Sequence, residues 1–120
     1  MFFVLIIEMR DLEEFIAELK RKGKLIIVEG KRDKEALKNL GIKNVFVLNG
    51  PLYKNIEHIS NNFKEVIILT DLDPEGRKLF SRLNSRLQER GVKVDNSFRE
   101  FLFKETKLRQ IEGILTYLQK

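Results

Sequence analysis

The segment Val66-Ile-Ile-Leu-Thr-Asp-Leu-Asp-Pro-Glu-Gly76 is the most informative part of the sequence about the fold, because in it a continuous apolar run passes directly into an acidic turn. Such a run is typical of a strand that is covered on both faces, as strands of parallel sheets are. Pro74 suits the first position of a helix, and apolar residues then recur at helical spacing from Leu79 to Leu87. The segment therefore predicts a strand, a turn and a helix, in that order.

The same order recurs along the rest of the chain. Buried strands are expected at residues 25–28, 44–48, 65–70 and 92–94. Helices are expected at residues 10–22, 34–40, 53–63, 74–90 and 106–119. Strands that alternate with helices imply right-handed parallel crossovers and helices on both faces of a small sheet. The fold class is therefore α/β, with residues 1–120 forming one domain.

The composition limits the kinds of functional site that the chain can contain. The chain has 120 residues, 42% hydrophobic and 34% charged, which is typical of one folded domain. It has no Cys and a single His, so disulfides, thiolate sites and His-rich zinc sites are excluded and any metal must be held by oxygen. The net charge of +5 favours polyanionic partners such as nucleic acid.

The apolar run Phe2–Ile7 is six residues long, too short to span a membrane. We therefore expect a cytoplasmic protein with no membrane partner. The run could continue the first helix, add a strand or pack against a partner, and the last option raises a homodimer or larger complex.

Two strand ends carry the candidate site. In open parallel sheets, sites lie outside the carboxyl ends of the strands, where the strand order reverses. If the order is 2-1-3-4, the reversal falls between the first and third strands, and their ends carry Glu29-Gly30 and Asp71-Leu-Asp73. These three carboxylates would converge at one crevice, where Asp71 and Asp73 could share a cation. The alternatives are that Asp73 only caps a helix and that Glu29-Gly30 is only a turn.

Basic residues follow both acidic ends. Lys31, Arg32 and Arg77 stand in the first turns of the predicted helices. There they could bind phosphate together with the helix N-terminal amides. A small acidic site within a basic protein is what metal-assisted phosphodiester chemistry requires.

Three segments resemble the Toprim domain family, which is shared by topoisomerases, bacterial primases and several nucleases. They are Leu25–Asp33, Val45–Gly50 and Val66–Gly76, and the resemblance covers residues 24–94. The signal that is specific for this family is the combination of two motifs: an acidic residue followed by Gly after one strand, and Asp-x-Asp-x-x-Gly after another. The compact size is closest to small stand-alone Toprim proteins that resemble the 5S ribosomal RNA maturation ribonuclease.

The resemblance implies a compact three-layer, Rossmann-like fold with a mainly parallel four-stranded sheet. It implies that Glu29 is the general acid or base and that Asp71 and Asp73, with Glu29, hold Mg²⁺ or Mn²⁺. It also implies supporting roles for residues that match the family pattern: Gly30, Asp33, Gly50 and Gly76. Asp33 is equally well explained as an acid in the first turn of a helix.

Three hypotheses of function follow. The leading one is a Mg²⁺-dependent nuclease acting on structured RNA, as in ribosomal RNA processing, or on DNA. The second is a non-catalytic Toprim module that binds nucleic acid or recruits a partner. The third is a phosphatase, since Asp-x-Asp also begins the haloacid-dehalogenase pattern, but there the pair follows the first strand.

The remaining polar and aromatic residues favour structural interpretations. Tyr53 and Tyr117 lie on apolar helical stripes, so we expect both to pack in the core. His58 is expected at or near the surface. The segment 98–104 interleaves Phe with charged residues, and covering a sheet edge is favoured over stacking of bases.

Overall fold

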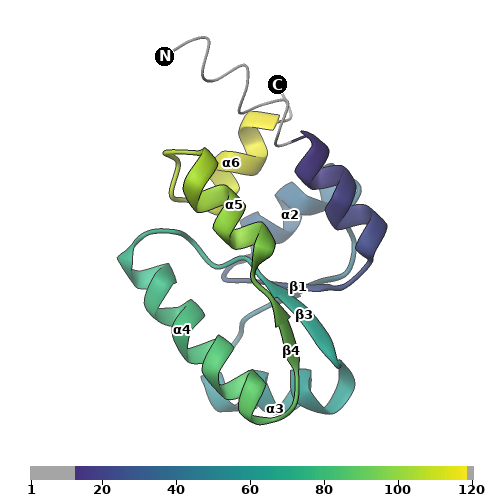
Figure 1. The fold of residues 1–120 in the computed structure, drawn as a ribbon, viewed down its shortest axis with the longest axis vertical. Helices are drawn as coiled ribbons and strands as arrows, with labels where there is room; N and C mark the ends of the chain where they lie inside the picture. Colours follow the sequence, from purple (N-terminus) through teal and green to yellow (C-terminus); the bar gives the residue numbers. More distant parts are fainter. Residues whose placement is uncertain (1–12, 119–120) are drawn as a thin grey trace.

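A four-stranded parallel sheet forms the centre of the computed structural model, which describes residues 13–118 (Figure 1). Its strands are β1 (Leu25–Val28), β2 (Val45–Val47), β3 (Glu65–Ile68) and β4 (Lys93–Asp95). The strand order is β2-β1-β3-β4, and every neighbouring pair is parallel. The expected α/β class and the reversal between the first and third strands are both confirmed.

Helices connect the strands, precede the first and follow the last. The structure has α2 (Lys31–Asn39), α3 (Leu52–Asn62), α4 (Pro74–Glu89), α5 (Ser97–Glu105) and α6 (Ile111–Leu118), and residues 13–22 are also helical. None of the helices described is long and apolar enough to cross a membrane. The apolar run Phe2–Ile7, on which the dimer hypothesis rested, lies outside the described residues.

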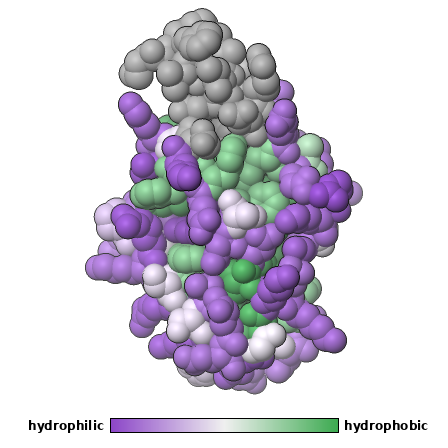
Figure 2. All heavy atoms as spheres, in the orientation of Figure 1, coloured by the Kyte–Doolittle hydropathy of each residue, from purple (hydrophilic) through white to green (hydrophobic). Residues whose placement is uncertain are grey.

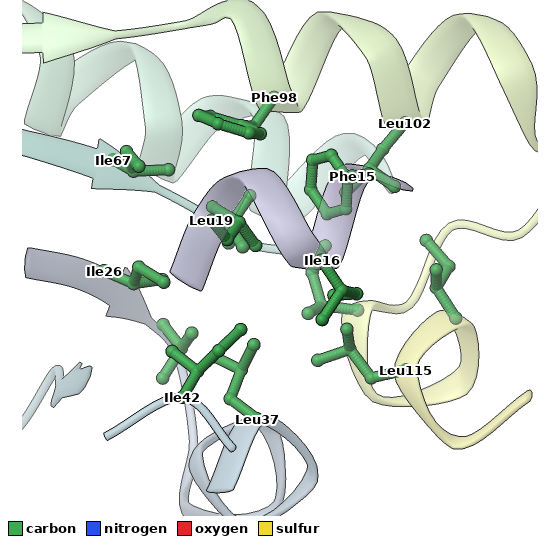
Figure 3. Close-up of a cluster of buried hydrophobic side chains, with 14 of the residues drawn as sticks. Phe15, Ile16, Leu19, Ile26, Leu37, Ile42, Ile67, Phe98, Leu102 and Leu115 are labelled. Carbon is green, nitrogen blue, oxygen red and sulfur yellow. The ribbon is translucent and has the colours of Figure 1, made fainter. Parts of the chain in front are cut away.

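The pleat of the sheet divides the core into two layers. Leu25, Ile27, Val66 and Ile68 pack with α3 and α4 on one face. On the other face, Ile26 and Ile67 pack with the helix at 13–22 and with α2, α5 and α6, as Figure 3 shows for Leu19, Leu37, Phe98 and Leu115. Because β1 is buried along its whole length, its sequence is continuously apolar rather than alternating. The helices on both faces give the predicted three layers.

The C-terminal region differs from the prediction. A single helix at 106–119 was expected, but the structure has α5, a loop at 106–110 and then α6. In this loop the Arg109 carbonyl accepts a hydrogen bond from the Leu72 amide at 2.6 Å. The loop is therefore held against the turn after β3, which a continuous helix could not reach.

The Phe-rich segment is α5, and its rings have different environments. Phe98 is buried, with its ring centroid 5.1 Å from that of Phe15, and Phe101 stacks on Phe15 at 5.5 Å. Phe103 is 41% exposed. The favoured interpretation, hydrophobic cover, therefore describes Phe98 and Phe101, while Phe103 stays at the surface.

Two further expectations concern α3. Tyr53 was predicted to pack in the core, but it is 59% exposed, because the apolar stripe of α3 is centred on Ile56 and Ile59 and Tyr53 lies to one side of it. His58 is exposed as predicted, and its ring stacks on that of Phe46 with 5.5 Å between the ring centroids. Hydrophilic residues cover most of the face drawn in Figure 2, with apolar residues showing between them near α5 and β4.

Candidate functional site

Glu29 and Asp71 meet at the point where the strand order reverses. Glu29 follows β1 and Asp71 follows β3, and these strands are adjacent, with Ile27 paired with Ile68. The Asp71 amide donates a hydrogen bond to Glu29 Oε2 at 2.6 Å. The two acidic ends, 42 residues apart in sequence, are thus joined directly.

The Asp71 carboxylate also contacts the start of α6. Its Oδ1 accepts a hydrogen bond from the Ile111 amide at 2.8 Å. No described residue donates a hydrogen bond to Asp71 Oδ2 or to Glu29 Oε1. One oxygen of each carboxylate is therefore left for another ligand.

Asp73 has a different position from the other two acids. Its Oδ1 accepts from the Gly76 amide at 2.8 Å, so Asp73 is the N-cap of α4. Its Oδ2 accepts from Gln110 Nε2 at 2.9 Å. Asp73 therefore does cap α4, and both of its oxygens are hydrogen-bonded.

An open cavity of about 470 Å³ contains the site. We call it the acidic cavity, and it is lined by Glu29, Gly30, Lys31, Arg32, Asp33, Asp71, Gln110 and Glu112. Carboxylates outnumber cations on its walls. Within residues 13–118, however, no three acidic or His side chains lie close enough together to hold a metal ion. The expected convergence thus brings Glu29 to Asp71, whereas Asp73 is held at the α4 N-terminus.

The carboxylates nevertheless influence one another. Burial raises the pKa of Glu29, the Asp71 amide lowers it, and the charges of Asp71 and Asp73 raise it further. The neighbouring negative charges that help to raise the pKa of Glu29 would be offset by a cation, and ligands made only of oxygen suit Mg²⁺. Glu29 and Asp71, joined through the Asp71 amide, are therefore the two oxygen donors that a divalent ion would find here.

Asp33 is buried at the start of α2, with 8% of its surface exposed. Its Oδ2 accepts a hydrogen bond from the Gly30 amide at 3.1 Å, so it stabilises the first turn of the helix. Burial is the main cause that raises its pKa to about 6, and the charges of Asp71, Glu29 and Glu112 add to the effect. Asp33 thus has a structural role and contributes negative charge to the acidic cavity.

Two of the predicted glycines have clear physical reasons. A Cβ on Gly76 would lie 2.1 Å from the Asp71 carbonyl oxygen, so only glycine fits at this position of α4. Gly50, just after β2, has a φ of +73°, which side chains rarely adopt. The close approach at Gly76 is between two parts of the backbone, and the resemblance alone did not reveal this.

The predicted phosphate-binding residues separate into two places. Lys31 and Arg32 are exposed at the start of α2 and line the acidic cavity. Arg77 is exposed on α4, and its guanidinium carbon lies 5.3 Å from the centroid of the Phe103 ring. Arg77 therefore faces α5 rather than the acidic cavity.

Arg99 is the site residue that the sequence did not indicate. It is only 7% exposed, and it donates hydrogen bonds to the Thr70 carbonyl and, at 2.7 Å, to the Asp71 carbonyl. Its guanidinium also lies 4.6 Å from the centroid of the Phe80 ring. Arg99 thus fixes the peptide groups that carry Asp71.

Burial lowers the pKa of Arg99 to about 10, against the opposing charges of Glu29 and Asp71, so the side chain is charged at neutral pH. The only signal in the sequence is that Arg99 lies between Phe98 and Leu102, on the side that a helix here would bury. Because apolar and charged residues are interleaved in this segment, the sequence did not predict that helix.

Known proteins resemble this chain over most of its length. A family model described as a Toprim domain matches residues 23–96. A UPF0292 protein of Methanocaldococcus jannaschii is 38% identical over 114 residues, which cover 89% of each chain. A UPF0292 protein of Methanosarcina barkeri is 36% identical over 116 residues, 91% of this chain and 81% of that one.

A solved structure agrees with these relatives. It is described as a putative protein from Aquifex aeolicus, is 38% identical, and superposes with a TM-score of 0.78. The match covers 85% of this chain and 96% of that one.

Proposed function

Because the chain belongs to the Toprim domain family, we propose that it is a Mg²⁺-dependent nuclease that hydrolyses phosphodiester bonds in structured RNA or in DNA. The family gives it a nucleic-acid-related function, and the proposal adds the reaction. A single observation carries it: the Asp71 amide bonded to Glu29 Oε2 at 2.6 Å, which holds two acids together at the switch point of the sheet.

Each residue of the acidic cavity has a role in this proposal. Glu29 takes the proton of the attacking water, and burial raises its pKa toward the range in which a carboxylate is an effective general base. Asp71, with Glu29 and Asp73, would hold the metal through oxygen. Bound there, Mg²⁺ would offset phosphate charge and act as a Lewis acid. Lys31 and Arg32 bind the phosphates next to the reacting bond.

Arg99 is a positioning residue in this scheme. It contacts the carbonyls of Thr70 and Asp71 and so acts on the reaction only through the backbone. The proposal also includes a cytoplasmic location, where substrates of this kind are found.

A non-catalytic nucleic-acid-binding module is the second candidate. The observation that favours it is the hydrogen bonding of both Asp73 oxygens, to Gly76 and to Gln110. A metal ion at Asp73 would have to share Oδ2 with Gln110, whereas a binding module needs no such sharing.

The test is cleavage of end-labelled structured RNA, duplex DNA and single-stranded DNA, with Mg²⁺ or with EDTA. Glu29→Gln and Asp71→Asn should abolish cleavage, because each removes a charge at the site while keeping the side-chain shape. Glu57→Gln, an exposed change on α3, is the matched control and should cleave normally. Cleavage that survives both site variants contradicts the nuclease proposal. Salt-sensitive binding without cleavage supports the binding module.

A further inference from the structure

A second cavity lies on the other side of the turn that follows β3. It has a volume of about 420 Å³, within the range of roughly 300–1,000 Å³ found for small-molecule sites. Residues of α4 and α5 form most of its wall, and we call it the α4–α5 cavity. Asp71 lines the acidic cavity and the next residue, Leu72, lines this one. The two cavities are thus separated by a single turn of backbone.

The walls of the α4–α5 cavity combine aromatic and cationic groups. Apolar surface comes from Leu72, Phe80 and Phe103. Charge comes from Arg77, Arg99 and Lys104 against a single carboxylate, Glu100. The acidic cavity has the opposite balance. Without a metal ion, an anionic group with a flat apolar part therefore fits the α4–α5 cavity better than its neighbour.

Phe103 is placed to act as a stacking platform. It is 41% exposed, although a Phe on a helix normally faces the core. Guanidinium groups of Arg77 and Arg109 lie 5.3 Å and 4.6 Å from its ring centroid, and such contacts help to hold a ring in position. Aromatic rings of this kind bind unpaired bases by stacking, and a base that stacks on Phe103 takes the place of a guanidinium group that lies over the ring.

Asn96 adds a polar group that lacks a partner. Its Oδ1 is buried, and no described residue donates a hydrogen bond to it. Asn96 also lines the α4–α5 cavity. Asn96 thus adds an amide side chain to the cavity wall, but its Oδ1 is closed to solvent, so a ligand reaches that oxygen only if the side chain turns.

We infer that the α4–α5 cavity binds one unpaired nucleotide of the substrate, next to the phosphodiester group in the acidic cavity. The base stacks on Phe103, and Arg77 and Lys104 bind its phosphate. The inference rests on the proposed function and adds a substrate preference. It also involves α5, which begins at Ser97, just beyond the region that matches the family model.

The experiment measures binding in EDTA, so that cleavage plays no part. The probe is a labelled RNA hairpin with one unpaired adenosine, compared with the same hairpin carrying an abasic residue at that position. Fluorescence anisotropy gives both dissociation constants. Stacking of one base predicts that the wild-type protein binds the adenosine hairpin at least about fivefold more tightly.

Two variants test the cavity in opposite ways. Phe103→Ala removes the platform, and Ser81→Phe fills the cavity from α4, where Ser81 is an exposed lining residue. Both should bind the two hairpins equally. The matched controls are Tyr53→Ala, at another exposed aromatic residue, and Ser85→Phe, one turn further along α4 and outside the cavity wall. Both controls should keep the preference, and circular dichroism checks that every variant is folded.

Equal binding of the two hairpins by the wild-type protein overturns the inference, and so does a full preference in both Phe103→Ala and Ser81→Phe. Absence of binding to either hairpin also overturns it. A protein that cleaves RNA with Mg²⁺ but shows no preference refutes the nucleotide subsite and leaves the proposed nuclease standing. A preference without any cleavage refutes the nuclease and leaves the subsite standing.

Discussion

The substitution Gly76→Ala should be severely destabilising, because the backbone of α4 touches the turn after β3. A Cβ at this position would lie 2.1 Å from the Asp71 carbonyl oxygen, 2.5 Å from its carbon and 2.8 Å from its Cα. All three are backbone atoms, so no side-chain rotation can relieve the overlap. The turn or the first turn of α4 must therefore move.

That movement breaks hydrogen bonds that hold the site together. The Asp71 amide donates to Glu29, and its carbonyl accepts from Arg99. The Gly76 carbonyl accepts from Thr70 Oγ1 at 2.8 Å. Overpacking costs about 1–3 kcal/mol, and each hydrogen bond lost adds about 1 kcal/mol. We expect the free energy of unfolding to fall by at least about 3 kcal/mol.

Gly113→Ala is the matched control, the same change in another helix. There the nearest atom to a new Cβ is Gln110 Cβ at 3.9 Å, an ordinary contact. Ala is a better helix former than Gly by about 1 kcal/mol, so this variant should be slightly more stable than the wild type.

Urea unfolding followed by circular dichroism measures both free energies. The two variants should differ by roughly 4 kcal/mol, with opposite signs relative to the wild type. A Gly76→Ala protein within about 1 kcal/mol of the wild type would refute the reasoning, because it would mean that the turn can move at little cost.

Three more predictions concern the groups around the site. Arg99→Met leaves the buried Thr70 and Asp71 carbonyls without their donor, so the free energy of unfolding in urea should fall by at least about 2 kcal/mol; a fall below about 1 kcal/mol would show that water replaces the guanidinium. Asp33 binds its proton more tightly when folded, with a pKa of about 6 against 3.8, so stability should fall as pH rises from about 4 to 6. In EDTA, the free energy of unfolding of Asp33→Asn should therefore rise by about 1–3 kcal/mol relative to that of the wild type as the pH increases over that interval. If urea unfolding shows a difference between the two proteins that does not change with pH, the prediction is contradicted. Asp73→Ala should lose about 1 kcal/mol because the α4 cap is removed, while Asp73→Asn keeps the cap; if thermal unfolding does not separate them, the cap is not stabilising.

Much of the candidate site was predictable because it lies at strand ends. Glu29 and Asp71 each follow a buried apolar run, and a parallel sheet places such ends at one edge. For the two residues to meet, β1 and β3 then had to be neighbours in the sheet, as the expected strand order makes them. Their contact through the Asp71 amide follows from that adjacency.

The parts that were missed depend on chain segments far apart in sequence. Arg99 comes 28 residues after Asp71, whose carbonyl it contacts, and its position on the buried side of a helix is the only local signal for it. Whether Asp73 only caps α4 or also binds a metal depends in part on Gln110, which lies 37 residues further along the chain and donates a hydrogen bond to Asp73. The direction of Arg77 likewise depends on Phe103 of α5.

The α/β class, the order of the strands with the helices between them, and the acidic residues at the reversal of the sheet all follow from the sequence. They do so because burial imposes a local pattern on apolar residues, and that pattern is visible in the chain. The packing of α5 and α6 over the turn after β3, and the separation of an acidic cavity from a cationic one by that turn, depend on the tertiary structure. Those features arise from packing between segments that are far apart in the chain, and such contacts produce no regular spacing of residues that could be recognised in the sequence.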